Sequence, residues 1–141
     1  MPRRRPSALR ARLWVNRRRY RPAPKIPTLS SRTCAAIAHI EQQRLRPGAI
    51  VGAFAEYEHF VRQPGRHLYL PNAGCPCCDP KNARDTLEYT LRRLPAIERA
   101  ELARLVTRLD QEFRRRTIPE PHPHVRPRQP GAWWYYRISE L

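Results

Sequence analysis

Residues 95–116 read PAIERAELARLVTRLDQEFRRR and carry the most regular apolar pattern in the chain. The apolar side chains recur at i, i+3, i+4, i+7 and i+11, a spacing that places them on the side of an α-helix that faces a core. Pro95 suits the start of such a helix, because the first turn does not need its missing N–H. We therefore expect a helix from about Pro95 to Arg116, with a core-facing stripe of Leu102, Leu105, Val106, Leu109 and Phe113.

Charged residues near the end of this helix are expected to lie on its solvated side. Asp110 precedes Arg114 by four residues, and Glu112 precedes Arg116 by the same spacing. Opposite charges at i and i+4 are neighbours on a helix surface, so both are expected to form ion pairs.

Two shorter helices are expected earlier in the chain. The first runs from a cap at Ser31 to about Leu45, where a Pro-Gly pair ends it. The second covers residues 50–61 and stops before another Pro-Gly turn. Their apolar positions are Cys34, Ile37, Ala38 and Ile40 in the first helix, and Ile50, Val51, Phe54, Tyr57 and Val61 in the second.

Asp79 and Pro80 mark the start of a further helix, which we expect to reach about Leu94. Asp is a favoured N-cap and Pro is favoured at the first helical position. The break before Pro95 is short, so this helix and the next should form a hairpin packed on the two earlier helices. The fold class is therefore mainly α, a small domain of about four helices. The apolar positions of this helix are Ala83, Leu87, Leu91 and Leu94.

The two ends of the chain differ in composition from this helical centre. Residues 1–30 are expected to be a disordered, basic arm that contains prolines, residues 31–118 the helical domain with its cysteine loop, and residues 119–141 a proline-rich spacer with an aromatic tail. The tail is expected to dock on the domain, because exposed tryptophans would promote association. Alternatively, the aromatic residues of the tail could stack on nucleic-acid bases or bind a protein partner. These residues are Trp133, Trp134, Tyr135 and Tyr136.

Positive charge is concentrated in the N-terminal arm. Nine arginines and Lys25 fall within the first 25 residues, which contain no acidic residue, and the whole chain has a net charge of +16. Such a segment attracts polyanions, and the planar guanidinium suits phosphate. Non-specific contact with DNA or RNA is the leading expectation. The candidate arginines are Arg3, Arg4, Arg5, Arg10, Arg12, Arg17, Arg18, Arg19 and Arg21.

Two other interpretations of the arm stay open. It could be a plain solvated tail, and its acid-free amphipathic start is also typical of an organelle transit peptide or of a start codon placed too far upstream. The longest apolar runs, such as residues 34–38 and 49–55, are much shorter than the roughly 18 residues of a membrane span. Neither a membrane span nor a secretory signal is therefore expected, and a reducing cytoplasm is the expected location.

A cysteine cluster, Cys75-Pro76-Cys77-Cys78, lies just before Asp79. Its C-P-x-C turn resembles the knuckle of zinc ribbons and rubredoxins, in which two thiolates point at one metal, although the knuckle generally has glycine where this chain has Asp79. Zinc prefers four ligands, so Cys75 and Cys78 need two more. Cys77 and His67 are the first candidates, and the other candidates are Cys34, His39, His59, His122 and His124.

The cysteines also admit two interpretations without a metal. They could be small, inert side chains in a tight loop, or thiols activated for redox chemistry by the helix N-terminus that follows. The sequence contains no Gly-rich phosphate loop, nucleophile elbow or paired-carboxylate site. A non-enzymatic, accessory nucleic-acid-binding protein with a structural zinc is therefore expected, and an adaptor that binds proteins through the helical hairpin and aromatic tail is the alternative.

The block from Gly74 to Pro121 also resembles a group of small proteins from high-GC actinobacteria. The shared features are the GCPCCDP loop at residues 74–80, then LP and RL, the RTIPEP sequence at residues 116–121, and an aromatic end. The resemblance covers about the C-terminal half of the chain and implies a helical hairpin after the loop. It implies no activity, and the basic arm is not part of the shared pattern.

Overall fold

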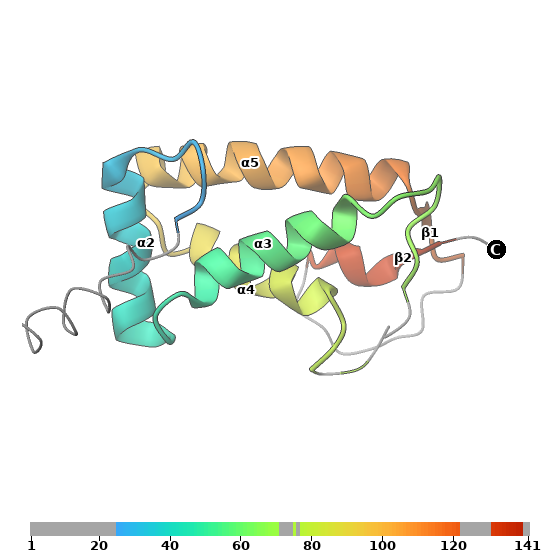
Figure 1. Cartoon of the computed structure of the whole chain (residues 1–141), viewed down its shortest axis with the longest axis horizontal. Helices are drawn as coiled ribbons and strands as arrows, with labels where there is room; N and C mark the ends of the chain where they lie inside the picture. The colour runs from blue at the N-terminus through green and yellow to red at the C-terminus, as the bar shows by residue number, and fades with distance from the viewer. Residues whose placement is uncertain (1–24, 71–74, 76, 122–130, 140–141) are drawn as a thin grey trace, which may run out of the picture.

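The computed structural model describes residues 25–70, 75, 77–121 and 131–139. Within these residues the fold is mainly α, as expected, with a two-stranded antiparallel sheet and a short 3-10 helix, η1. Figure 1 shows α5 along one side of the molecule, α2 crossing near the start of α5, and α3 in front of α4. The elements are α2 (Ser31–Arg44), α3 (Ala49–Val61), α4 (Lys81–Leu91), α5 (Ala96–Arg115), β1 (Ile118–Pro119), η1 (Trp133–Tyr136) and β2 (Arg137–Ile138).

The corner between α2 and α3 is held by a buried carboxylate. Ser30, rather than Ser31, caps α2, since its hydroxyl accepts a hydrogen bond from the Thr33 backbone N–H at 3.2 Å. Gly48 takes a left-handed φ of 79°, which lets the chain turn into α3. Glu41 accepts hydrogen bonds from the N–H groups of Gly48 and Ile50 at 2.9 and 2.8 Å. A side chain of α2 therefore satisfies donors at the start of α3 that have no partner within their own helix.

The hairpin of α4 and α5 agrees closely with the sequence-based prediction at the start of α4 and less closely at the turn between the helices. The Asp79 carboxylate accepts a hydrogen bond from the Lys81 N–H at 3.0 Å, as expected of a capping residue. Helix α4 ends at Leu91, three residues before the expected end. Leu94 is nevertheless buried, and the Arg99 guanidinium donates to its carbonyl oxygen at 2.8 and 3.2 Å. This contact closes the turn into α5.

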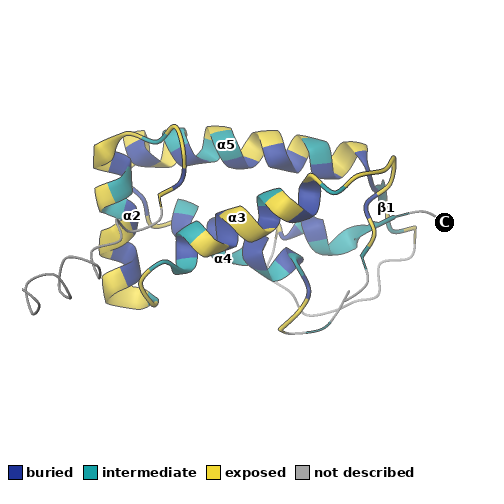
Figure 2. Cartoon of the chain, in the orientation of Figure 1, coloured by how far each residue is buried: buried dark blue, intermediate teal, exposed yellow. Residues whose placement is uncertain are grey.

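The core lies between α3, α4 and α5, as the dark blue faces in Figure 2 show. Four residues of the expected α5 stripe are buried, while Leu105 is half-buried at its edge. Ala38 is exposed, contrary to its expected place on the apolar side of α2. The largest fully buried side chains are Tyr57, Phe113, Ile50, Leu68, Leu87, Leu94 and Leu102.

Both ends of the described chain pack on this core. Ile26 is only 4% exposed, so the folded part begins before the boundary expected at residue 31. The aromatic tail docks on the domain, as expected: Trp134 is 3% exposed, and the Trp133 ring lies 5.7 Å from that of Phe113. In the sheet, Ile118 of β1 pairs with Ile138 of β2, which holds the C-terminal segment beside the end of α5.

Candidate functional site

Three thiols meet in the loop before α4. The sulfur of Cys77 lies 3.4 Å from that of Cys75 and 3.3 Å from that of Cys78, and all three lie within 4.8 Å of one another. A tetrahedral zinc ion with Zn–S bonds of about 2.3 Å would hold its sulfurs about 3.8 Å apart. The three sulfurs are thus spaced closely enough for the cysteines together to hold one metal ion.

The loop is fixed to the first turn of α4. The carbonyl oxygen of Cys75 accepts a hydrogen bond from the Asp79 N–H at 3.1 Å and one from the Asn82 side-chain amide at 3.5 Å. Cys75 is half-buried, whereas Cys77 and Cys78 are exposed. The thiols thus lie at the molecular surface beside a helix N-terminus, whose partial positive charge favours thiolates.

The outer two thiols differ in acidity. Hydrogen bonds from the Cys77 backbone and from the neighbouring thiols lower the pKa of Cys75. Hydrogen bonds with Cys77 and Cys75 raise the pKa of Cys78 to about 11. Cys75 is therefore the first of these two to become a thiolate, the form that binds a metal.

His67 does not join the thiol group. It is exposed on a segment that is held elsewhere, because the Leu68 N–H donates to the carbonyl oxygen of Arg116 at 3.2 Å, at the end of α5. The expectation that His67 completes the site is therefore not met. Among the other candidates, Cys34, His39 and His59 lie on α2 and α3 outside the group, and His122 and His124 lie outside the described residues.

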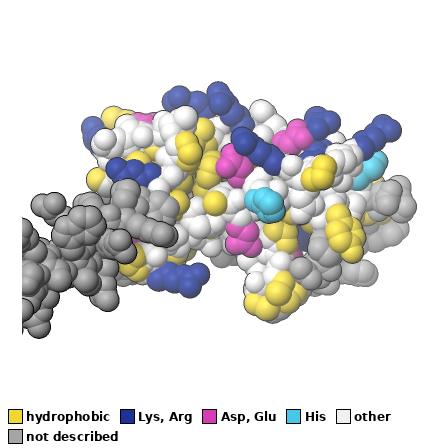
Figure 3. Space-filling view, in the orientation of Figure 1, with side chains coloured by type: hydrophobic (Ala, Val, Ile, Leu, Met, Phe, Trp, Pro, Cys, Tyr) yellow, Lys and Arg dark blue, Asp and Glu magenta, His cyan; other side chains and the backbone are white. Residues whose placement is uncertain are grey.

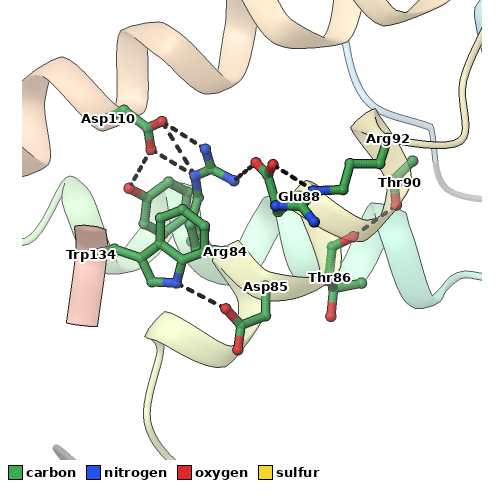
Figure 4. Close-up of polar contacts among 9 residues, drawn as sticks. Arg84, Asp85, Thr86, Glu88, Thr90, Arg92, Asp110 and Trp134 are labelled. Atoms are coloured by element: carbon green, nitrogen blue, oxygen red, sulfur yellow. Dashed lines mark hydrogen bonds and ion pairs between the residues drawn. The ribbon is translucent and has the colours of Figure 1, made fainter. Parts of the chain in front are cut away.

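A second polar cluster is buried between α3, α4 and α5 (Figure 4). The Asp110 carboxylate accepts a hydrogen bond from the Tyr57 hydroxyl at 2.8 Å and is paired with Arg84, whose Nε and Nη2 lie 2.9 and 3.0 Å from its two oxygens. Arg84 also donates to Glu88 at 3.1 Å. Asp110 is only 8% exposed, so the expected surface pair with Arg114 is wrong, because the true partner comes from α4.

This cluster also holds the aromatic tail in place. The Arg84 guanidinium lies 4.3 Å from the centre of the Trp134 ring, a cation–π contact. The Trp134 indole N–H donates to Asp85 at 2.9 Å, as Figure 4 shows. Tyr135 donates from its hydroxyl to the same carboxylate and lies 3.1 Å from the Asn82 side chain. Burial and the neighbouring carboxylate of Asp110 raise the pKa of the Tyr57 hydroxyl, which stays a donor.

The other expected ion pair near the end of α5, between Glu112 and Arg116, is present but is longer than the contact of Glu112 with Arg115. Glu112 accepts hydrogen bonds from Arg115 at 2.8 and 2.6 Å, whereas the nearest nitrogen of Arg116 is 4.0 Å away. Arg116 is buried, and its guanidinium donates to the carbonyl oxygens of Val61 and Gly65 at 2.6 and 2.8 Å. Arg116 therefore supplies donors to carbonyl groups at the end of α3 and in the loop that follows, and the last carbonyls of a helix have no partner within it.

The folded part carries a smaller share of the positive charge than the arm. The described residues contain 17 basic and 11 acidic side chains, a net charge of +6, against +16 for the whole chain. The nine candidate arginines from Arg3 to Arg21 lie outside the described residues. Figure 3 shows Lys and Arg side chains gathered along the edge of the domain formed by α5.

Comparisons with protein-family models, with curated proteins and with solved structures found no match to this chain. None of the described helices has both the length and the apolar character that a membrane crossing requires.

Proposed function

We propose that this protein is a non-enzymatic, accessory nucleic-acid-binding factor that contacts the phosphates of DNA or RNA through its basic arm. The observation that carries the proposal is the distribution of charge. Nine arginines fall between residues 3 and 21, and no acidic residue occurs before Glu41. Residues 1–40 therefore supply no side-chain carboxylate that could neutralise these arginines.

Phosphate neutralisation supplies the affinity in this proposal. Each Arg that meets a phosphate of duplex DNA releases condensed counterions and contributes about 0.9 to the slope of log K against log salt concentration. Contacts of this kind position a protein on nucleic acid and carry no sequence information. Binding is accordingly non-specific and strongly dependent on salt.

The aromatic tail is a weaker candidate for the binding element. Trp134 is buried against Arg84, and the rings of Trp133 and Tyr135 are half-buried in contacts with the domain. A protein partner or a nucleobase that used these ring faces would first have to displace those contacts. This competition favours the arm over the tail.

Deletion of residues 2–24 tests the proposal. The deletion must keep Lys25 and Ile26, because Ile26 is part of the core. We expect the truncated protein to lose most of the salt dependence of binding, measured by fluorescence anisotropy on labelled duplex and single strand between about 50 and 200 mM salt. A full-length variant with the nine arm arginines replaced by Gln serves as the control for length. If the deleted protein binds with unchanged affinity and salt slope, the arm is not the binding element.

We propose further that the metal held by Cys75, Cys77 and Cys78 is zinc in a structural role. Thiolates favour soft metals, and zinc is the usual choice where the site only joins segments of chain. The metal would hold together the loop that comes directly before α4. The fourth ligand is expected from His122, His124 or water.

Metal analysis of freshly purified, reduced protein tests the zinc proposal. We expect about one equivalent of zinc, and a lower melting temperature after chelation. Cys77→Ser should reduce the zinc content, whereas Cys34→Ser, on α2 outside the group, should not. Less than about a tenth of an equivalent in the wild-type protein would refute a resident zinc.

A further inference from the structure

We infer that the folded domain carries a second contact site for nucleic-acid phosphates, in a cleft between residues 28–30 and α5. Arg104 and Arg108 are the residues that would bind phosphate there. The inference rests on the proposed nucleic-acid function and states where a strand bound by the arm continues onto the domain.

The cleft has a volume of about 670 Å³. Its walls include Thr28 and Ser30 on one side, and Glu101, Arg104 and Arg108 on the other. A water molecule occupies about 30 Å³ of liquid, so the cleft has room for a phosphate group with its hydration. Guanidinium groups are usual donors to nucleic-acid phosphates, whereas the Ser30 hydroxyl already donates to Glu101.

The two arginines are available for a ligand. They lie one turn apart on α5 and so point to the same side of the helix, and both are exposed. Within the described residues neither guanidinium makes a hydrogen bond or an ion pair. By contrast, Arg84 and Arg115 are engaged with carboxylates.

The one carboxylate in the cleft is already occupied. Both oxygens of Glu101 accept hydrogen bonds from Ser30, from the backbone N–H at 3.0 Å and from the hydroxyl at 2.9 Å. These hydrogen bonds, with that of the backbone N–H first, lower the pKa of Glu101 and keep it ionised. The charge of Arg104 also acts on this carboxylate, so the cleft holds two guanidinium groups against one carboxylate.

The wall opposite α5 is held in an unusual backbone conformation. Thr28 has a φ of 70° and is the one residue other than glycine with a positive φ among those that the structure describes. A β-branched residue is disfavoured there. Such strain persists only where neighbours enforce it, and it clusters at ligand-binding sites. Here buried Ile26 on one side and the Ser30–Glu101 hydrogen bonds on the other fix the segment.

The cleft is also close to the arm along the chain. Thr28 follows Arg21 by seven residues, and a chain spans at most about 3.5 Å per residue, so the segment that joins them can span at most about 25 Å. One strand of duplex DNA carries about seven phosphates over that distance. The spacing therefore allows one nucleic acid to meet both the arm and the cleft.

The test is the full-length double variant Arg104→Ala, Arg108→Ala, compared with wild type on the same duplex. Loss of two phosphate contacts should reduce the salt slope by about 1.8 and weaken binding up to about 60-fold near 0.1 M salt. The matched control is Arg46→Ala, Arg66→Ala, which removes the same charge from two exposed positions, one before α3 and one on the loop after it. Arg104→Lys, Arg108→Lys should keep most of the slope, since lysine retains the charge.

The outcomes separate the two proposals. If wild type binds with a steep salt dependence and the Arg104, Arg108 variant is no weaker than the control variant, the cleft is not a contact site while the role of the arm stands. If wild type itself shows no salt-dependent binding, the proposed function fails and the cleft proposal fails with it. Melting temperatures close to that of wild type are expected for all the variants, because the substituted side chains are exposed.

Discussion

Removal of the Asp110 carboxylate is expected to destabilise the domain strongly. Asp110 accepts the Tyr57 hydroxyl and pairs through both oxygens with Arg84, which is only 5% exposed. In Asp110→Ala the guanidinium stays buried and loses its main partner, a change that costs about 3 to 5 kcal/mol of unfolding free energy. Arg84 keeps its contact with Glu88, so we expect a value near the lower end, about 3 kcal/mol.

Urea unfolding followed by circular dichroism measures this effect. Glu112→Ala is the matched control, because it removes a carboxylate two residues away that pairs with exposed Arg115 and should cost no more than about 1 kcal/mol. Tyr57→Phe removes one hydrogen bond to the charged group and should cost about 1.5 to 3 kcal/mol. Equal costs for Asp110→Ala and Glu112→Ala would refute the assignment of a buried network between α4 and α5.

Three further predictions concern the core, the tail and acid stability. Leu109→Ala should cost about 2 to 5 kcal/mol, whereas Arg108→Ala, one residue earlier and exposed, should cost little; equal costs in urea unfolding would mean that the α5 stripe is misplaced. The variant Trp14→Phe removes the tryptophan of the arm. Its tryptophan fluorescence should be blue-shifted, because Trp134 is buried, and should not change when oligonucleotide is added. Strong quenching by a soluble quencher in the free protein would contradict the docked tail. Burial alone would raise the pKa of Glu88, but hydrogen bonds from two arginines outweigh this effect and lower the pKa. The contribution of Glu88 to stability is therefore present above about pH 4.3, the pKa in the unfolded chain, and is lost as the pH falls through the pKa in the folded protein. Glu88→Gln should therefore make the unfolding free energy less sensitive to acid below that pH, and an unchanged pH profile would contradict the shift.

The helices could be predicted from the sequence because their signals are local. The α5 stripe depends on apolar residues at most eleven positions apart, and the cap of α4 depends on Asp79 and its immediate neighbours. Both features appear in the structure with small changes of boundary. Helix α4 ends at Leu91, before the break at Pro95. Leu94 lies in the turn between the two helices and is still buried in the core.

The buried polar contacts could not be predicted, because they join residues that are distant in sequence. Asp110 meets Arg84 from 26 residues away, and the guanidinium of Arg116 reaches Val61 over 55 residues. A rule based on i, i+4 spacing pairs Asp110 with Arg114 and so misses its contact with Arg84. Glu41 was missed for a related reason, since its role depends on the corner between α2 and α3.

The candidate metal site shows the same division. Cys75, Cys77 and Cys78 are adjacent in sequence, so their grouping in space follows from the loop itself. The position of His67 depends on hydrogen bonds between Arg116 and the residues around His67, which hold this segment at the end of α5. These contacts join residues far apart in sequence, so a local pattern does not predict them.

The central claim of nucleic-acid binding through the arm is tested most directly by the salt dependence of binding of the intact protein to duplex DNA. The account predicts a steeply negative slope of log K against log salt, approaching about −8 if all nine arginines of the arm meet phosphates and steeper still by up to about 1.8 if Arg104 and Arg108 also do. A slope near zero, or no binding at low salt, would contradict it.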